Sequence, residues 1–161
     1  MTAIDTLIGF VAQSVATDAD LCAWCTGQFG RPPMVYVDID DANPPAQDDY
    51  PVVAIHGVSR NGSLGRNGWS IDLDLACGLV NQSMEREAAA SGAVIVIYAG
   101  MPQAARMMEL VELAAVRALR GPYPQISVTG ENGQVSEYPL FAAFTTLTID
   151  QMPSSRSPRI K

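Results

Sequence analysis

The sequence predicts an α+β domain in which helices pack on one face of a mainly antiparallel β-sheet, in the order α-α-β-β-β-β-α-β-β-β. Three observations support this fold class. One long segment has apolar residues at helical spacing, and several shorter segments alternate between apolar and polar residues as half-buried strands do. With 161 residues and 48% hydrophobic content, the chain is also long enough to bury a real core as one domain.

The longest helix is expected over residues 102–120. Pro102 suits a first helical turn, where its missing N–H costs no hydrogen bond, and Gly121-Pro122 ends the helix. One face of this helix is apolar, so we expect it to cover the sheet. The residues of that face are Met107, Leu110, Val111, Ala114 and Ala118.

Two more helices and a strand are predicted before this point. Residues 2–16 form an amphipathic helix that Thr2 can cap, and residues 17–29 form a shorter helix capped by Thr17 or Asp18. Residues 34–39 alternate as a strand, and the proline-rich, acidic residues 40–51 form a loop.

The middle of the chain is rich in strand patterns. Residues 52–56 predict a strand, residues 59–68 a polar, glycine-rich excursion, and residues 69–79 the clearest alternating strand. Residues 81–92 are polar and predict a short helix or a loop. The continuous β-branched run 93–98 predicts a central strand.

The last third of the domain predicts a hairpin and a final strand. Residues 125–129 and 134–138 flank Asn132-Gly133, which is a strong hairpin signal. Residues 140–149 read as the last strand. We therefore expect one domain over residues 1–150 and a flexible tail over 151–161, which lacks apolar content.

Composition narrows the possible functions. The net charge of −7 argues against a nucleic-acid reader, which usually carries a basic patch. No apolar run approaches the length that spans a membrane, and the N-terminus does not resemble a secretory signal. With three cysteines and no export signal, we expect no disulfide framework and synthesis in a cytoplasm.

Cys22-Ala-Trp-Cys25 has the C-x-x-C spacing of redox and metal sites. Redox pairs usually follow a strand and begin a helix, where the helix dipole lowers the thiol pKa. Here the pair lies inside a predicted helix, and no second pair or histidine cluster completes a zinc site. Two core cysteines are therefore favoured over a redox or metal site.

Two other groups of residues invite a functional interpretation. Asp38, Asp40, Asp41, Asp48 and Asp49 offer oxygen ligands to a hard cation, but their spacing misses the calcium-loop pattern, so a solvated acidic loop is favoured. His56, the only histidine, has no recognisable serine nucleophile to serve, so a half-exposed strand histidine is favoured over catalysis. We expect no catalytic residue, no metal and no cofactor, and hence no enzyme.

Glycines at 62, 65 and 68 lie between Arg60 and the strand that begins at Trp69. A phosphate-binding loop would need a strand before it and a helix after it, whereas this loop joins two predicted strands. A mobile hairpin arm is favoured, of a kind that can become ordered against a partner. Trp24 is expected in the core, whereas Trp69 fits either the core or an interface.

Four stretches give the chain its resemblance to the tail terminator (tail completion) proteins of long-tailed phages. They are Asp49–Ile55, with its Tyr-Pro-Val-Val, the alternating strand Trp69–Leu75, the helix Met107–Leu119 and the strand Phe141–Ile149. Residues 81–93 look like an insertion relative to the short members of that family.

The resemblance implies a structural virion protein that forms a ring, usually a hexamer. Such a ring caps the tail tube, stops its polymerisation and joins it to neck or connector proteins. The protein would be assembled in the host cytoplasm and located in the virion, with DNA passing through the ring without specific binding and with no membrane involved. A ring subunit needs two different faces that close by rotation. Candidate interface residues are Arg60, Leu64, Arg66, Trp69, Arg156 and Arg159, and candidate lumen-facing residues are Asp72 and Asp74.

Other functions remain open at this point. Another head-tail connector or minor tail protein would have similar sequence features, and only its position in the particle separates it from a terminator. A small α+β enzyme would need a polar cluster in a pocket. A toxin-like or adaptor module would form a small complex with one host protein.

Overall fold

The computed structural model describes residues 3–61, 69–121 and 128–152. It confirms the α+β class, with the order α-α-β-β-β-β-β-α-β-β in place of the predicted one. The helices are α1 (Ala3–Thr17), α2 (Ala19–Phe29) and α3 (Gly100–Arg120), and a short 3-10 turn, η1, spans Gln47–Asp49. The strands are β1 (Met34–Val37), β2 (Val52–Asn61), β3 (Trp69–Val80), β4 (Met84–Ala88), β5 (Val94–Tyr98), β6 (Val128–Glu137) and β7 (Leu140–Met152).

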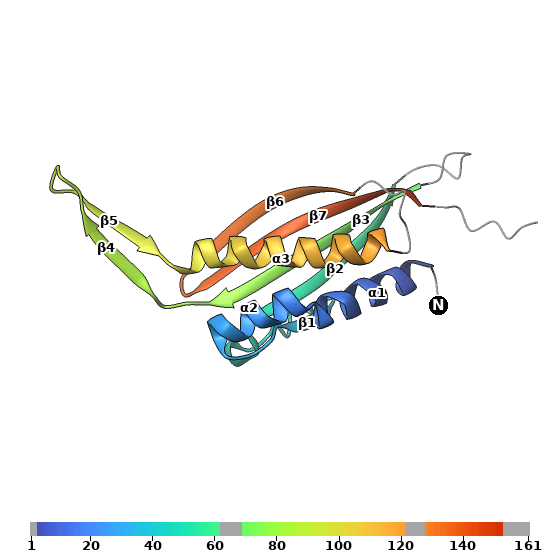
Figure 1. The fold of residues 1–161 in the computed structure, drawn as a ribbon, viewed down its shortest axis with the longest axis horizontal. Coiled ribbons are helices and arrows are strands. Elements are labelled where there is room, and N and C mark those ends of the chain that lie inside the picture. The colour runs from blue at the N-terminus through green and yellow to red at the C-terminus, as the bar shows by residue number, and fades with distance from the viewer. Residues whose placement is uncertain (1–2, 62–68, 122–127, 153–161) are drawn as a thin grey trace, which may run out of the picture.

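Five strands form one twisted sheet in the order β1-β2-β3-β7-β6. Only β1 and β2 are parallel, and the other neighbours pair antiparallel, so the prediction of a mainly antiparallel sheet is confirmed. All three helices lie on the same side of this sheet (Figure 1), as expected. The opposite face, which we call the outer face, carries none of the described helices.

The core lies between α3, α1 and the helix side of the sheet. The alternation of β3 works as predicted, because every second residue faces the helices and is at most 2% exposed. The apolar face of α3 meets these residues, and four of its five predicted positions are buried; Ala118 is half-buried. The buried residues of β3 are Ile71, Leu73, Leu75, Cys77 and Leu79.

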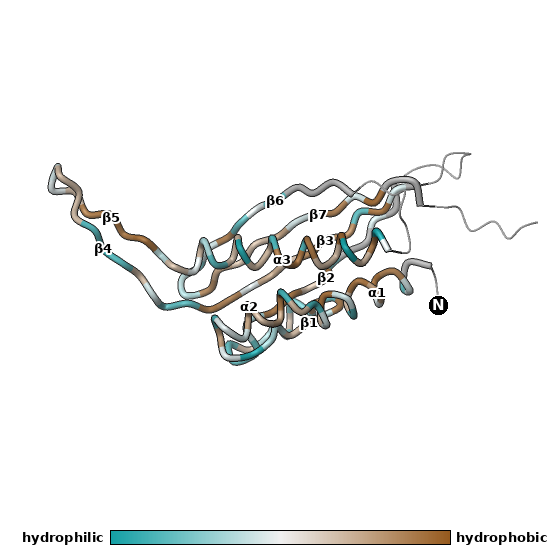
Figure 2. Tube along the Cα trace, viewed as in Figure 1, coloured by the Kyte–Doolittle hydropathy of each residue, from teal (hydrophilic) through white to brown (hydrophobic). Residues whose placement is uncertain are grey.

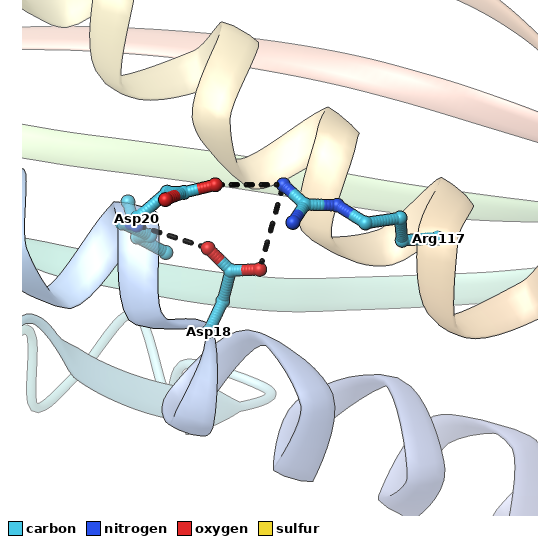
Figure 3. A network of polar contacts seen from close by, with 4 residues as sticks. Asp18, Asp20 and Arg117 are labelled. Carbon is cyan, nitrogen blue, oxygen red and sulfur yellow. Dashed lines mark hydrogen bonds and ion pairs between the residues drawn. The ribbon is translucent and has the colours of Figure 1, made fainter.

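The junction of α2 with α3 is held by a polar network (Figure 3). Asp18, one of the two predicted caps, is the N-cap of α2, and its carboxylate accepts the backbone N–H of Leu21 at 2.9 Å. The guanidinium of Arg117 on α3 lies 3.7 Å from Asp18 and 3.3 Å from Asp20. The network therefore ties the start of one helix to the last turn of another.

The predicted hairpin around Asn132-Gly133 is wrong. Both residues lie inside β6, which pairs along its whole length with β7, and the chain reverses instead at Tyr138-Pro139. The ring of Phe144 in β7 lies over Gly133, where a Cβ would stand 2.3 Å from ring atoms. A large aromatic over a glycine of the neighbouring strand stabilises an extended pairing that the glycine alone would weaken. Of the two predicted strands, residues 125–127 lie outside the described residues.

The prediction of a central strand at residues 93–98 is also wrong. Residues 94–98 form β5, which pairs only with β4 in a separate two-stranded sheet. The segment expected to be a short helix or loop, residues 81–92, supplies β4 and the turn. Together β4 and β5 form a hairpin that projects from the body beyond the start of α3 (Figure 1). We call residues 84–98 the arm.

The remaining differences concern the ends of elements. The strand expected over 34–39 ends at Val37, because Asp38 has a positive φ of 60° that leaves the extended region. β2 extends to Asn61 and takes the first residues of the predicted polar excursion. β7 extends to Met152, two residues past the expected end of the domain, and the rest of the expected tail lies outside the described residues.

Candidate functional site

The C-x-x-C pair lies within α2, as predicted, and its environment disfavours the reactive thiolate form. Cys25 is fully buried, and burial, reinforced by Cys22, raises its pKa to about 12. Cys22 is half-buried, and burial and the Asp18 carboxylate raise its pKa. Burial likewise raises the pKa of Cys77 in β3 to about 12. These thiols stay protonated at neutral pH, which is the reverse of what a redox pair needs.

The acidic loop uses its carboxylates to make its own turns. Asp40 accepts the backbone N–H of Ala42 at 2.9 Å and the amide of Asn43 at 2.8 Å, and these hydrogen bonds lower its pKa. Asp49 accepts the N–H of Ala46 at 2.9 Å. Within the described ranges, no three His, Cys, Asp or Glu side chains are grouped as a metal site would require.

The other predicted residues are dispersed. His56 is half-buried in β2, and it pairs across the sheet with Asp74 in β3. Trp24 is half-buried against the core, with its ring edge-on to Phe29 at 5.8 Å. Arg60 lies in β2 and Trp69 begins β3, and the structure describes the backbone but not the side chains of these two. The remaining interface candidates, Leu64, Arg66, Arg156 and Arg159, lie outside the described residues.

The two lumen-facing candidates come together on the outer face of the sheet. Asp72 and Asp74 alternate with the buried residues of β3, so both carboxylates lie on the side away from the helices. The hydroxyl of Thr148 donates to Asp72 at 2.7 Å, and that of Thr146 donates to Asp74 at 2.6 Å. Ser59 of β2 donates to Asp72 at 3.3 Å. Hydroxyls on both neighbouring strands therefore hold an acidic patch in place.

The arm carries the longest run of consecutive exposed apolar residues among the described residues. All five residues of β5 are apolar and exposed, from 60% at Val94 to 40% at Tyr98, and Met84 of β4 is 45% exposed. Figure 2 shows β5 as a hydrophobic strand standing clear of the body. A two-stranded hairpin is marginally stable in water by itself, and a long hydrophobic edge strand invites pairing with another chain.

The base of the arm is fixed to the body, so the arm has a defined direction. The ring of Tyr98 lies 5.5 Å from that of Tyr138 and 6.4 Å from that of Phe141. Tyr138 also donates a hydrogen bond of 3.0 Å to the backbone carbonyl of Gln82. Both ends of the hairpin are thereby tied to the β6–β7 turn.

A groove of about 420 Å³ runs between α3 and β6. Small residues line much of it, which leaves a recess beside the edge strand β6. Gln134 donates to the backbone carbonyl of Met101 at 3.2 Å and spans one part of the gap. Sequence patterns could not reveal this groove, because its walls come from segments far apart in the chain. Its lining residues are Ala105, Met108, Glu109, Asn132, Gly133, Gln134 and Ala143.

Comparisons with known proteins add no family to this description. No known family model matches the chain, and no curated protein matches its sequence. Within the part of the chain that the structure describes, none of the helices combines the length and the apolar character needed to cross a membrane.

Proposed function

We propose that this chain is a self-associating structural subunit of a phage particle: a tail terminator that forms a ring of six copies on the end of the tail tube. The ring would stop tube polymerisation and present a surface to neck or connector proteins. The observation that carries the proposal is the arm, a projecting hairpin whose strand β5 exposes five consecutive apolar residues.

The exposed apolar side chains of the arm carry a free-energy cost. Leaving this much apolar surface in water is unfavourable, and covering a Val or Ile side chain fully contributes about 1.5–3 kcal/mol. Natural proteins usually protect such edges with charges, prolines or a covering element. A subunit that becomes covered by its neighbours on assembly has no need of that protection. The low charged content of 17% also fits a chain with surface buried in an assembly.

The outer face supports the same proposal. If this face lines the lumen of the ring, Asp72 and Asp74 repeat around the channel and repel DNA as it passes. The hydroxyls of Thr146 and Thr148 fix the carboxylates in the acidic patch, so repulsion does not depend on mobile side chains. DNA would then pass without binding specifically.

The mass of the purified chain in solution tests self-association. Size-exclusion chromatography with light scattering should give a closed assembly of about six subunits, and electron microscopy should show rings. Adding the chain to a polymerising tail tube protein should stop growth and leave the ring at one tube end. A strict monomer at every concentration, or tubes that grow unchanged, would refute the proposal. A ring found elsewhere in the particle would instead favour a connector or minor tail protein.

The lumen assignment has its own test. Phages carrying Asp72→Lys and Asp74→Lys together should eject DNA more slowly, because the channel wall then attracts the DNA. The matched control is Asp41→Lys with Asp48→Lys, which makes the same change in net charge in the exposed acidic loop. Equal ejection by both double variants and the wild type would remove the lumen assignment.

A further inference from the structure

We infer that β5 of the arm adds to the free edge of β6 in a second copy of this chain, so that the arm of each subunit fills the α3–β6 groove of the next. This inference rests on the proposed ring function and assigns the two surfaces that meet. Four observations support it, and each concerns described residues only.

The first observation is that both partners offer an unpaired strand edge. β6 is the last strand of the five-stranded sheet, and β5 pairs on one side only, with β4. An exposed edge presents a row of backbone N–H and C=O groups that another strand can satisfy by adding to the sheet. β6 spans ten residues and β5 five, so the full length of β5 fits along it.

The second observation is the match of side chains on the two faces. Val94 and Val96 share one face of β5, and Ile95 and Ile97 share the other. When β5 lies beside β6, the valines enter the groove, whose lining includes Ala105 and Ala143. Small groove residues therefore meet β-branched side chains that fill the recess.

The isoleucines find apolar neighbours on the other side of β6. There the outer face exposes Val135 to 56% and Phe144 to 45%. The Phe144 ring reaches the edge, because it lies over Gly133 of β6. Both faces of β5 thus meet apolar surface. A hydrophobic patch on only one side of the sheet would cover only one face of the strand.

The third observation is charge. Arg86 is the cross-strand partner of Val96, so it lies on the face of the arm that enters the groove. Glu109 lines that groove, is exposed, and forms an ion pair of 2.8 Å with Arg106. The acidic partners of Ile95 and Ile97, Glu87 and Glu85, lie on the opposite face, away from Glu109. In this orientation Arg86 faces the Glu109 side of that ion pair, and the carboxylates of Glu85 and Glu87 stay on the face away from Glu109.

The fourth observation concerns geometry within one chain. The arm leads away from the body beyond the start of α3 (Figure 1), whereas the groove is lined by residues of α3, β6 and β7 in the body. The contacts of Tyr98 with Tyr138 and Phe141 hold the base of the arm in that direction. The occupant of the groove is therefore a second copy, and a contact between two different surfaces of identical chains propagates until it closes as a ring.

Two complementary variants test the inference. The double variant Val94→Glu with Val96→Glu places charges on the arm and leaves the groove unchanged. The variant Ala105→Trp fills the groove and leaves the arm unchanged. All three positions are exposed, so the fold should survive, and circular dichroism checks this. Each variant alone should associate at least about tenfold more weakly than the wild type. Mixed together, the two should form a 1:1 dimer by light scattering, because one intact arm then meets one intact groove and growth stops.

The controls separate this inference from the function on which it rests. Phe10→Glu changes an equally exposed apolar residue on α1, 40% like Val96, and should leave assembly unchanged. Arg86→Glu should weaken assembly, and adding Glu109→Arg should restore it. A wild-type monomer would refute the proposed function itself. A wild-type ring that survives the arm and groove variants, or a mixture that gives no dimer, would overturn the arm-to-groove contact while leaving the ring function standing.

Discussion

Two glycine-to-alanine substitutions make the same chemical change but should differ in how much they destabilise the fold. At Gly100, the first residue of α3, an added Cβ would lie 2.0 Å from one carbon of the Phe141 ring and 2.3 Å from another. At Gly133 in β6, it would lie 2.3 Å from two carbons of the Phe144 ring. Both distances are far below van der Waals contact, so in each case the ring must move.

The two rings differ in their freedom to move. Phe141 is 2% exposed and is enclosed by the core and by Tyr98, so Gly100→Ala overpacks a site that cannot relax. Overpacking costs about 1–3 kcal/mol, and alanine recovers less than about 1 kcal/mol of helix propensity. We expect a net loss of about 2 kcal/mol, or roughly 4–8 °C in Tm for a chain of this size.

Phe144 is 45% exposed, so its ring can rotate into solvent. Alanine also restricts the unfolded chain more than glycine does, which offsets part of the lost ring contact. We therefore expect Gly133→Ala to change stability by no more than about 0.5 kcal/mol. Urea denaturation, at a concentration where light scattering gives a monomer, measures both variants. Equal losses in the two variants, or a neutral Gly100→Ala, would refute the reasoning about ring mobility.

Two further predictions concern the helix junction and the buried thiol of β3. Asp18→Ala should lower the free energy of unfolding by about 1 kcal/mol, because it removes the N-cap of α2. Asp20→Ala should lower it by less than about 0.5 kcal/mol, because the contact of Asp20 with Arg117 is exposed. Similar losses for the two variants in urea denaturation would contradict this. Because the pKa of Cys77 is raised, the folded chain holds the thiol proton more tightly than the unfolded chain does. The protonated thiol therefore contributes fully to the free energy of unfolding below pH 9, and this contribution is lost as the pH rises toward 12. Stability of the wild type should fall more steeply with pH between 9 and 11 than that of Cys77→Ser, and parallel slopes would show that the thiol does not titrate on unfolding.

Much of the body follows from patterns along the chain. The alternation in residues 69–79 predicted which side of β3 is buried, because a sheet covered on one face imposes a period of two. The apolar stripe of α3 predicted the element that covers it. These signals are local, and the packing that they produce agrees with them.

The arm could not be placed by the same reasoning. A continuous run such as Val94–Tyr98 is typical of a strand covered on both faces, and nothing in the run says which chain provides the cover. The Asn132-Gly133 signal failed because Phe144, eleven residues later, lies over the glycine and favours the extended pairing. The sequence predicts only part of the acidic patch. The alternation places Asp72 and Asp74 on one face of the strand, but it does not indicate the threonines of β7 that donate hydrogen bonds to them.

The two borders of the arm are chemically unlike. β4 carries three consecutive charged residues, Glu85 to Glu87, whereas β5 carries none. Charged side chains on an edge strand disfavour pairing with another strand. The hairpin can therefore accept an added strand beside β5, and pairing beside β4 is disfavoured. Lateral stacking of arms into an endless fibril is thereby disfavoured.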